Sequence, residues 1–235
     1  MIERADDTSR QAWARLAGFL YMFTNATAIF GFYLRGQVIV RNDAAQTAAN
    51  MIETERLFRI GLAAELVTVA AVIPLFVGLY VVLKPVSGNL ALLATFWRLM
   101  ENCVLALITF ASFTALALVN GGTYMRDVDA TQLQVLTYTL IRVHTSGFQV
   151  GFLFLGLGSA LFSYLWWKSR YIPRWLAGLG IFASSMMAIV ALGIVVWPGL
   201  YSLLTMAYMA PMGIYEIGLG LWLLIKGIRV PAIER

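Results

Sequence analysis

The chain has 235 residues, of which 60% are apolar and only 12% are charged. Soluble proteins average about 45 to 50% apolar and about 25% charged residues, so this composition excludes an ordinary water-soluble domain and favours a protein embedded in lipid. The net charge of +5 does not indicate nucleic-acid binding, because the basic residues are scattered between apolar segments and form no run. The single cysteine, Cys103, excludes an intrachain disulfide and a paired-cysteine metal site.

Six apolar segments are long enough to cross a membrane as helices, since about 20 residues span the roughly 30 Å hydrocarbon layer. The first has no small-residue cleavage site behind it, so we expect a retained helix and not a signal peptide. In the fourth, residues 134–143 can also form a helical extension outside the lipid. The spans are expected near residues 13–34, 58–83, 90–118, 134–165, 175–197 and 203–226. The sequence therefore predicts an all-α, polytopic transmembrane bundle of about six helices, forming one domain over residues 1–235.

A polar segment between Arg35 and Glu55 joins the first two spans. Within it, Asp43 precedes an alanine-rich stretch, a pattern typical of an N-capped helix. We expect this helix to lie outside the membrane, where it can cover one mouth of the bundle. Pro74 and Pro211 lie inside the second and sixth spans, where a proline kinks a helix and frees backbone carbonyls.

Lysine and arginine residues are distributed unevenly between the two sets of alternate links. The side that holds both termini carries ten of them: Arg4, Arg10, Arg15, Lys84, Lys168, Arg170, Arg174, Lys226, Arg229 and Arg235. The opposite side carries five: Arg35, Arg41, Arg56, Arg59 and Arg126. Because cytoplasmic loops are enriched in Lys and Arg, we expect both termini in the cytoplasm. Five tryptophans fall at expected helix ends, where the headgroup region favours amphipathic rings: Trp13, Trp166, Trp167, Trp175 and Trp197.

Ionisable side chains inside a span cost about 2.5 to 3.5 kcal/mol each on insertion, so they normally face the bundle interior and pair. The expected spans hold six: Glu65, Arg98, Glu101, Arg142, His144 and Glu216. On the third span, an arc of about 100° contains a continuous polar face made of Arg98, Glu101, Asn102, Thr109 and Ser112. A lipid-facing stripe of this kind is too costly, so we expect the third span at the centre of the bundle.

A rise of about 1.5 Å per residue sorts these residues into two layers. Arg98, Glu101, Glu216 and Asn25 come out at roughly 12 to 17 Å from the cytoplasmic ends, and Glu65, Arg142 and His144 at roughly 27 to 35 Å. We expect Glu216 to pair with Arg98 in the inner layer, and Glu65 to pair with Arg142 or His144 in the outer layer. The inner layer then has a surplus carboxylate that can be protonated, hydrated, or bound to a cation. The candidate ligand-binding pocket comprises Arg98, Glu101, Asn102, Glu216, Asn25 and Tyr215.

His144 shares a helix face with Gly147, Gly151 and Gly158, and glycines at this spacing allow close approach of a neighbouring helix. The expected role of His144 is a hydrogen-bonded packing residue, with protonation or haem ligation as alternatives. No second histidine exists, which excludes a bis-histidine haem and a histidine-based zinc site. No nucleophile, base and orienting acid occur at a motif spacing, so the sequence indicates no catalytic residue, and it names no metal or cofactor.

Several segments, in this order, resemble the bacterial membrane family catalogued as domain of unknown function 4386. They are residues 40–50 (VRNDAAQTAAN), 57–61 (LFRIG), 79–85 (LYVVLKP), 90–94 (LALLA) with Arg98, His144 with Gly147 and Gly151, 171–174 (YIPR), and Glu216 with 221–227 (LWLLIKG). The resemblance covers nearly the whole chain and implies a bacterial membrane protein of several helices, without a reaction, substrate or cofactor. In that family pattern, Arg98, His144 and Glu216 look like recurring features. Where this chain has Asn42-Asp43, the pattern has Gly-Asp.

Three functional interpretations stay open. In the first, which we favour, the protein binds or moves a small solute, ion or proton through a pocket lined by Arg98, Glu101 and Glu216. In the second, it is a structural or regulatory membrane partner whose buried charges only fix helix packing. In the third, it is an intramembrane enzyme acting on a lipid or quinone through His144 or Glu101. The expected location is the bacterial cytoplasmic membrane, as a multi-pass protein with lipids as partners; the ligand and the oligomeric state do not follow from the sequence.

Overall fold

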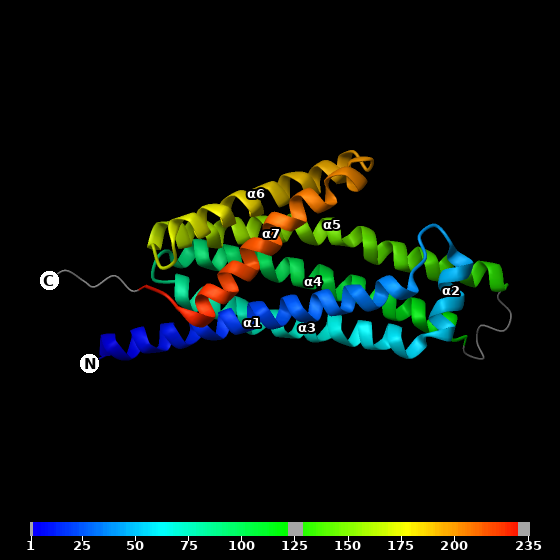
Figure 1. Cartoon of the computed structure of the whole chain (residues 1–235), viewed down its shortest axis with the longest axis horizontal. Helices are drawn as coiled ribbons and strands as arrows, with labels where there is room; N and C mark the ends of the chain where they lie inside the picture. The colour runs from blue at the N-terminus through cyan, green and yellow to red at the C-terminus, as the bar shows by residue number, and fades with distance from the viewer. Residues whose placement is uncertain (1, 122–128, 230–235) are drawn as a thin grey trace. The chain divides into compact units, whose positions relative to one another are not determined.

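The computed structural model describes residues 2–121 and 129–229, and helices make up nearly all of this part of the chain (Figure 1). The helices are α1 Ile2–Val38, α2 Ala44–Glu53, α3 Glu55–Leu83, α4 Gly88–Val119, α5 Ala130–Ser169, α6 Arg174–Val196 and α7 Leu200–Ile225. Six of the described helices, all except α2, are long and apolar enough to cross a membrane. The predicted all-α, multi-pass membrane protein is therefore confirmed.

The side of the membrane on which the termini lie stays a prediction. Of the residues counted for it, Arg126 and Arg235 lie outside the described residues, as does the side chain of Arg4.

Five of the described membrane-spanning helices, all except α6, are longer than the spans expected from the sequence. The longest, α5, has 40 residues, and at about 1.5 Å per residue it measures about 60 Å, twice the thickness of the hydrocarbon layer. Part of α5 therefore lies outside the lipid, which fits the extension considered for residues 134–143. Helix α1 continues to Val38, so the prediction that Arg35 belongs to a polar link is wrong. No proline precedes Asn42 in this segment, and the helix continues through Gly36 to Val38.

Helix α2 begins at an N-cap, as its sequence predicts. The Asp43 side chain accepts a hydrogen bond from the backbone N–H of Gln46 at 2.8 Å. Asn42, just before it, has a φ of 60°, a left-handed conformation that asparagine tolerates better than most residues. The position of α2 outside the membrane stays a prediction.

The chain divides into two compact units. The first unit comprises Met1–Thr24, Ala71–Asn102 and Gln149–Arg235, and the second comprises Asn25–Ala70 and Cys103–Phe148. Helices α6 and α7 belong only to the first unit and α2 only to the second, whereas α1, α3, α4 and α5 contribute to both. That residues 1–235 act as one domain stays a prediction.

Small residues bring the helices of the first unit close together. A Cβ atom added at Gly18 of α1 would lie 2.3 Å from the backbone nitrogen of Leu224 in α7. A Cβ atom added at Gly156 of α5 would lie 2.6 Å from the carbonyl oxygen of Ser184 in α6. Helices in lipid gain stability mainly from such close backbone packing, because the apolar surroundings offer no hydrophobic driving force between them.

The tryptophans at the helix ends do not all face the headgroup region. Trp175 and Trp197, at the two ends of α6, are 67% and 64% exposed, as the prediction requires. Trp166 lies in the last turn of α5, as predicted, but its ring is fully buried and packs edge-on against Tyr171, so it is not exposed to the headgroups. The link between α5 and α6 folds back over its ring, which the position of Trp166 in the sequence does not reveal.

The second unit has a small apolar core of its own. It forms where α2 packs with the neighbouring parts of α1, α3, α4 and α5. The buried members are Val38, Met51, Phe58, Leu62, Ala115, Leu116 and Ile141.

Candidate functional site

A buried arginine on α4 is the centre of a charged cluster in the first unit. Arg98 Nε lies 3.2 Å from Glu101 Oε2 on the same helix, and Arg98 Nη2 lies 3.7 Å from Glu216 Oε1 on α7. The three side chains are 5%, 9% and 16% exposed, respectively. The pairing of Arg98 with Glu216 expected from the sequence is therefore present in the structure. We call these three residues the Arg98 cluster.

The neighbours of Arg98 hold it across the gap between α4 and α5. Arg98 Nη1 donates a hydrogen bond to Ser159 Oγ at 3.0 Å, and its guanidinium carbon lies 5.0 Å from the centre of the Phe76 ring. Gly158 makes this path possible, because a Cβ atom there would lie 2.7 Å from Arg98 Cγ. Gly158 was expected to allow close packing of helices, and it does, because the same Cβ atom would also lie 3.0 Å from the backbone carbonyl oxygen of Ala94 on α4.

Charges in the Arg98 cluster do not balance. With all three groups ionised, two carboxylates face one guanidinium. Glu101 Oε2 is buried and accepts no hydrogen bond, although it lies close to Arg98 Nε. A buried charge without full compensation is expensive, so this arrangement can take up one more positive charge.

The other members of the predicted pocket fall in different places. Tyr215 precedes Glu216 in the sequence and is buried. Its hydroxyl accepts a hydrogen bond from Ser163 Oγ at 2.8 Å. Asn102 is buried, one residue beyond Glu101. Asn25 belongs to the second unit, so its participation with Arg98 stays a prediction. That these residues bind a ligand also stays a prediction.

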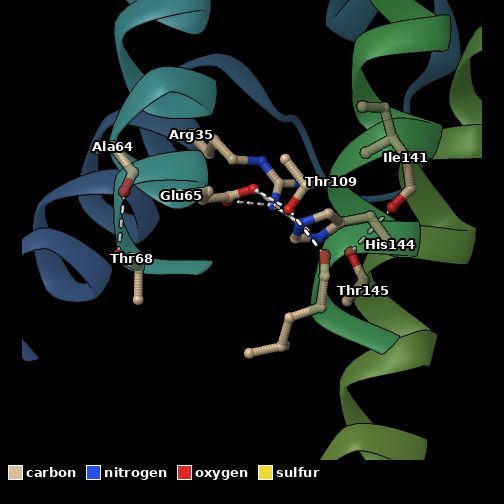
Figure 2. Close-up of polar contacts among 9 residues, drawn as sticks. Arg35, Ala64, Glu65, Thr68, Thr109, Ile141, His144 and Thr145 are labelled. Atoms are coloured by element: carbon tan, nitrogen blue, oxygen red, sulfur yellow. Dashed lines mark hydrogen bonds and ion pairs between the residues drawn. The ribbon is translucent and has the colours of Figure 1, made fainter. Parts of the chain in front are cut away.

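A second polar network lies within the second unit, where four helices each contribute one side chain that points toward the others (Figure 2). Glu65 Oε1 on α3 lies 2.9 Å from Arg35 Nη1 on α1. Glu65 Oε2 lies 3.1 Å from His144 Nε2 on α5 and accepts a hydrogen bond from Thr109 Oγ1 on α4 at 3.2 Å. Arg35 and His144 are almost completely buried. We call these four residues the Glu65 network.

The hydrogen bonds of the Glu65 network assign a tautomer to His144. Arg35 Nη1 lies 2.6 Å from both ring nitrogens, and an arginine can only donate. A carboxylate can only accept, so a neutral imidazole that bonds to both partners donates to Glu65 from Nε2 and accepts from Arg35 at Nδ1. With a neutral imidazole the network contains one cation and one anion. In contrast to the Arg98 cluster, its charges balance.

The structure decides between the two partners expected for Glu65. His144 is one of its partners, whereas Arg142 is exposed on α5 and is not among them. The second partner, Arg35, was missed because it was assigned to the link after the first span. The absence of any proline between Arg35 and Val38 is the signal that could have placed it on the helix.

Metal ligands are not concentrated anywhere in the part of the chain that the structure describes. Across residues 2–121 and 129–229, no three His, Cys, Asp or Glu side chains gather in a group that could hold a metal ion.

Comparison with known protein families identifies one family that the chain matches. The family model described as "Domain of unknown function (DUF4386)" matches residues 16–227. The chain belongs to the DUF4386 family. A protein of Archaeoglobus fulgidus described as "Uncharacterized protein" is similar to this DUF4386 protein, with 27% identity over 161 residues that cover 67% of this chain and 77% of the relative. No solved structure matches the chain. The descriptions of the family and of the relative name no reaction, so the two polar sites are the features that bear on function.

Proposed function

We propose that this DUF4386 protein binds a proton or a small cation at the Arg98 cluster, and that binding or moving this ion across the membrane is its function. The observation that supports the proposal is the charge imbalance of a buried site. Glu101 and Glu216 face a single guanidinium, and one carboxylate oxygen of Glu101 accepts no hydrogen bond.

An ion suits this site better than a larger solute does. A proton needs no cavity, and a small cation needs only a few oxygen ligands, which two carboxylates begin to supply. Ionisable residues within membrane spans are expensive and commonly mark ion pathways or proton relays. Arg98 fits such a role, because its single positive charge compensates only one of the two negative charges.

The test uses the full chain reconstituted in liposomes that contain a pH-sensitive dye. An outward proton gradient, with or without Na⁺ or K⁺, is imposed, and ion movement is recorded for the wild type and for Glu101→Gln, Glu216→Gln and the double variant. Binding without transport is followed separately, as the rise in melting temperature when Na⁺, K⁺ or protons are added. The matched control is Glu55→Gln, because Glu55 is a carboxylate with a 38% exposed side chain in the second unit.

We expect an ion response in the wild type and in the control that falls about tenfold or more in the double variant, since removing both carboxylates removes the ion's ligands. The proposal fails if no ion produces flux or a change in melting temperature. It also fails if the double variant responds like the wild type.

A structural role for the same charges is the second candidate. The observation that favours it is that Arg98 contacts α5 through Ser159 and α7 through Glu216, so it joins three helices. If this is the whole role, exchanging the charges of Arg98 and Glu216 should restore the stability that each single substitution loses, and no ion should have an effect.

We further propose that the protein resides in the cytoplasmic membrane of a bacterium with both termini inside. The excess of Lys and Arg on the side of the termini supports this orientation.

A further inference from the structure

One end of the first unit carries a concentration of exposed positive charge. This end contains the first turns of α1, α4 and α6, the last turns of α3, α5 and α7, and the links between them, which Figure 1 shows gathered near the N-terminus. Seven exposed cations of the described residues belong to it: Arg15, Lys84, Lys168, Arg170, Arg174, Lys226 and Arg229. We call this surface the basic end.

The basic end has no acidic counterpart among the described side chains. The carboxylates described in the first unit are Glu101, which is buried, and Glu216, which is partly buried. Both lie in the middle of their helices and pair with Arg98. In the sequence, the first turns of α1 add Glu3, Asp6 and Asp7 to this end. These three carboxylates are fewer than the seven exposed cations, so the basic end has a net positive charge, which favours an anionic partner.

Aromatic rings hold three of these cations in place. Arg174 lies 5.5 Å from the centre of the Trp167 ring, and Arg229 lies 5.3 Å from the centre of the Trp222 ring. Lys84 Nζ lies 5.8 Å from the centre of the Tyr80 ring. A guanidinium stacked on a ring keeps the N–H groups at its edge free to donate to an anion.

Hydrogen bonds fix the segments that carry these cations. The backbone N–H of Arg229 donates to the carbonyl oxygen of Tyr171 at 2.9 Å, which ties the chain after α7 to the link between α5 and α6. The backbone N–H of Ile228 donates to Gln11 Oε1 at 3.1 Å, and Arg10 Nη1 donates to the Tyr171 hydroxyl at 3.1 Å. The arginines therefore sit on a preformed surface, which lowers the entropy cost of binding.

We propose that the basic end is a binding surface for the phosphate groups of anionic lipids, of the phosphatidylglycerol class. Lipid is the partner because the cations lie at the ends of helices whose middle parts expose apolar side chains. Further along the same helices, large exposed apolar side chains such as Phe19, Leu93 and Phe182 require hydrocarbon. Exposed Trp167 and Trp175 lie between these apolar surfaces and the solvent, at the level where tryptophan meets the headgroups. The cations thus stand at the height of the lipid phosphates, where juxtamembrane basic residues attract anionic lipids.

The test measures binding of dioleoylphosphatidylglycerol and dioleoylphosphatidylcholine to the full chain in detergent, by native mass spectrometry and by the change in melting temperature. The variant Arg174→Gln/Arg229→Gln removes two ring-stacked charges. Arg41→Gln/Arg142→Gln is the matched control, because it removes two exposed arginines of the second unit. Inorganic phosphate and a short single-stranded DNA are titrated in parallel.

We expect the wild type and the control to prefer phosphatidylglycerol over phosphatidylcholine by roughly tenfold or more, and the Arg174/Arg229 variant to lose most of this preference. The preference should also weaken as salt is raised. Three results overturn the proposal: no preference for the anionic lipid, an equal loss in the control variant, or binding of inorganic phosphate or DNA at least as tight as that of the lipid. All these variants keep the Arg98 cluster, so this outcome is independent of ion binding there.

Discussion

Replacing Arg98 with methionine should destabilise the protein strongly, because it leaves Glu101 and Glu216 buried without their cation. At an effective dielectric constant of about 20, the separations of 3.2 and 3.7 Å correspond to attractions of about 5 and about 4 kcal/mol. The desolvation of the arginine, which the substitution relieves, offsets part of this loss. Removing one partner of a buried ion pair typically lowers the free energy of unfolding by about 3 to 5 kcal/mol. We expect Arg98→Met to fall in this range.

Two companion variants separate charge from packing. Glu101→Gln removes the surplus negative charge and keeps the Arg98–Glu216 pair, so we expect it to cost less than about 1 kcal/mol or to stabilise the protein. The uncharged triple variant Arg98→Met/Glu101→Gln/Glu216→Gln should recover most of the stability that the single arginine variant loses. Only an electrostatic origin of the loss predicts this recovery.

The assay is reversible unfolding in mixed micelles of detergent and sodium dodecyl sulfate, followed by tryptophan fluorescence and expressed as a free energy of unfolding. The deficit of Arg98→Met should shrink as the pH is lowered, because protonation neutralises the two carboxylates. The reasoning is refuted if Arg98→Met unfolds within about 0.5 kcal/mol of the wild type. A triple variant no more stable than Arg98→Met refutes it as well.

Three further predictions test other parts of the structure. Gly158→Ala should cost about 1 to 3 kcal/mol in the same unfolding assay, because the new Cβ atom meets the Arg98 side chain at 2.7 Å. The control Gly213→Ala should be nearly neutral, because nothing lies within 4 Å of its new Cβ atom. Equal costs of the two substitutions would contradict the packing argument. Glu65→Gln should cost about 3 to 5 kcal/mol because it leaves a buried guanidinium without its carboxylate, and exposed Arg142→Gln should stay within about 0.5 kcal/mol of the wild type. A reporter enzyme fused after Arg235 should be active in the cytoplasm; a signal from the opposite side would reverse the orientation.

Local helix geometry explains why part of the Arg98 cluster could be predicted. Arg98 and Glu101 are three residues apart, and a rotation of 100° per residue brings such residues to the same face. The expected depth of Glu216 then made it a partner for Arg98, and the structure places the two together. The Glu65 network was harder to predict, because its arginine lies beyond the expected end of the first span and hydrophobicity alone does not mark where a helix stops in water.

Exposure was also less predictable than helix position. Trp166 and Trp167 are neighbours at the end of α5, yet Trp166 is buried and Trp167 is 40% exposed. Successive helical residues point 100° apart, so only the position of the link after α5 decides which ring it covers.

The sequence by itself determined the class of this protein, its six spans and the polar face of α4. These properties follow from the thickness of the bilayer and from the period of the helix, and both act on consecutive residues. Only the tertiary structure decided which charges meet: Arg98 with Glu216, and Arg35 with Glu65 and His144. These partners lie on different helices, and their pairing depends on which helices become neighbours and how each is rotated. That choice is made by the packing of all the side chains together, including a glycine at residue 158 that leaves room for an arginine.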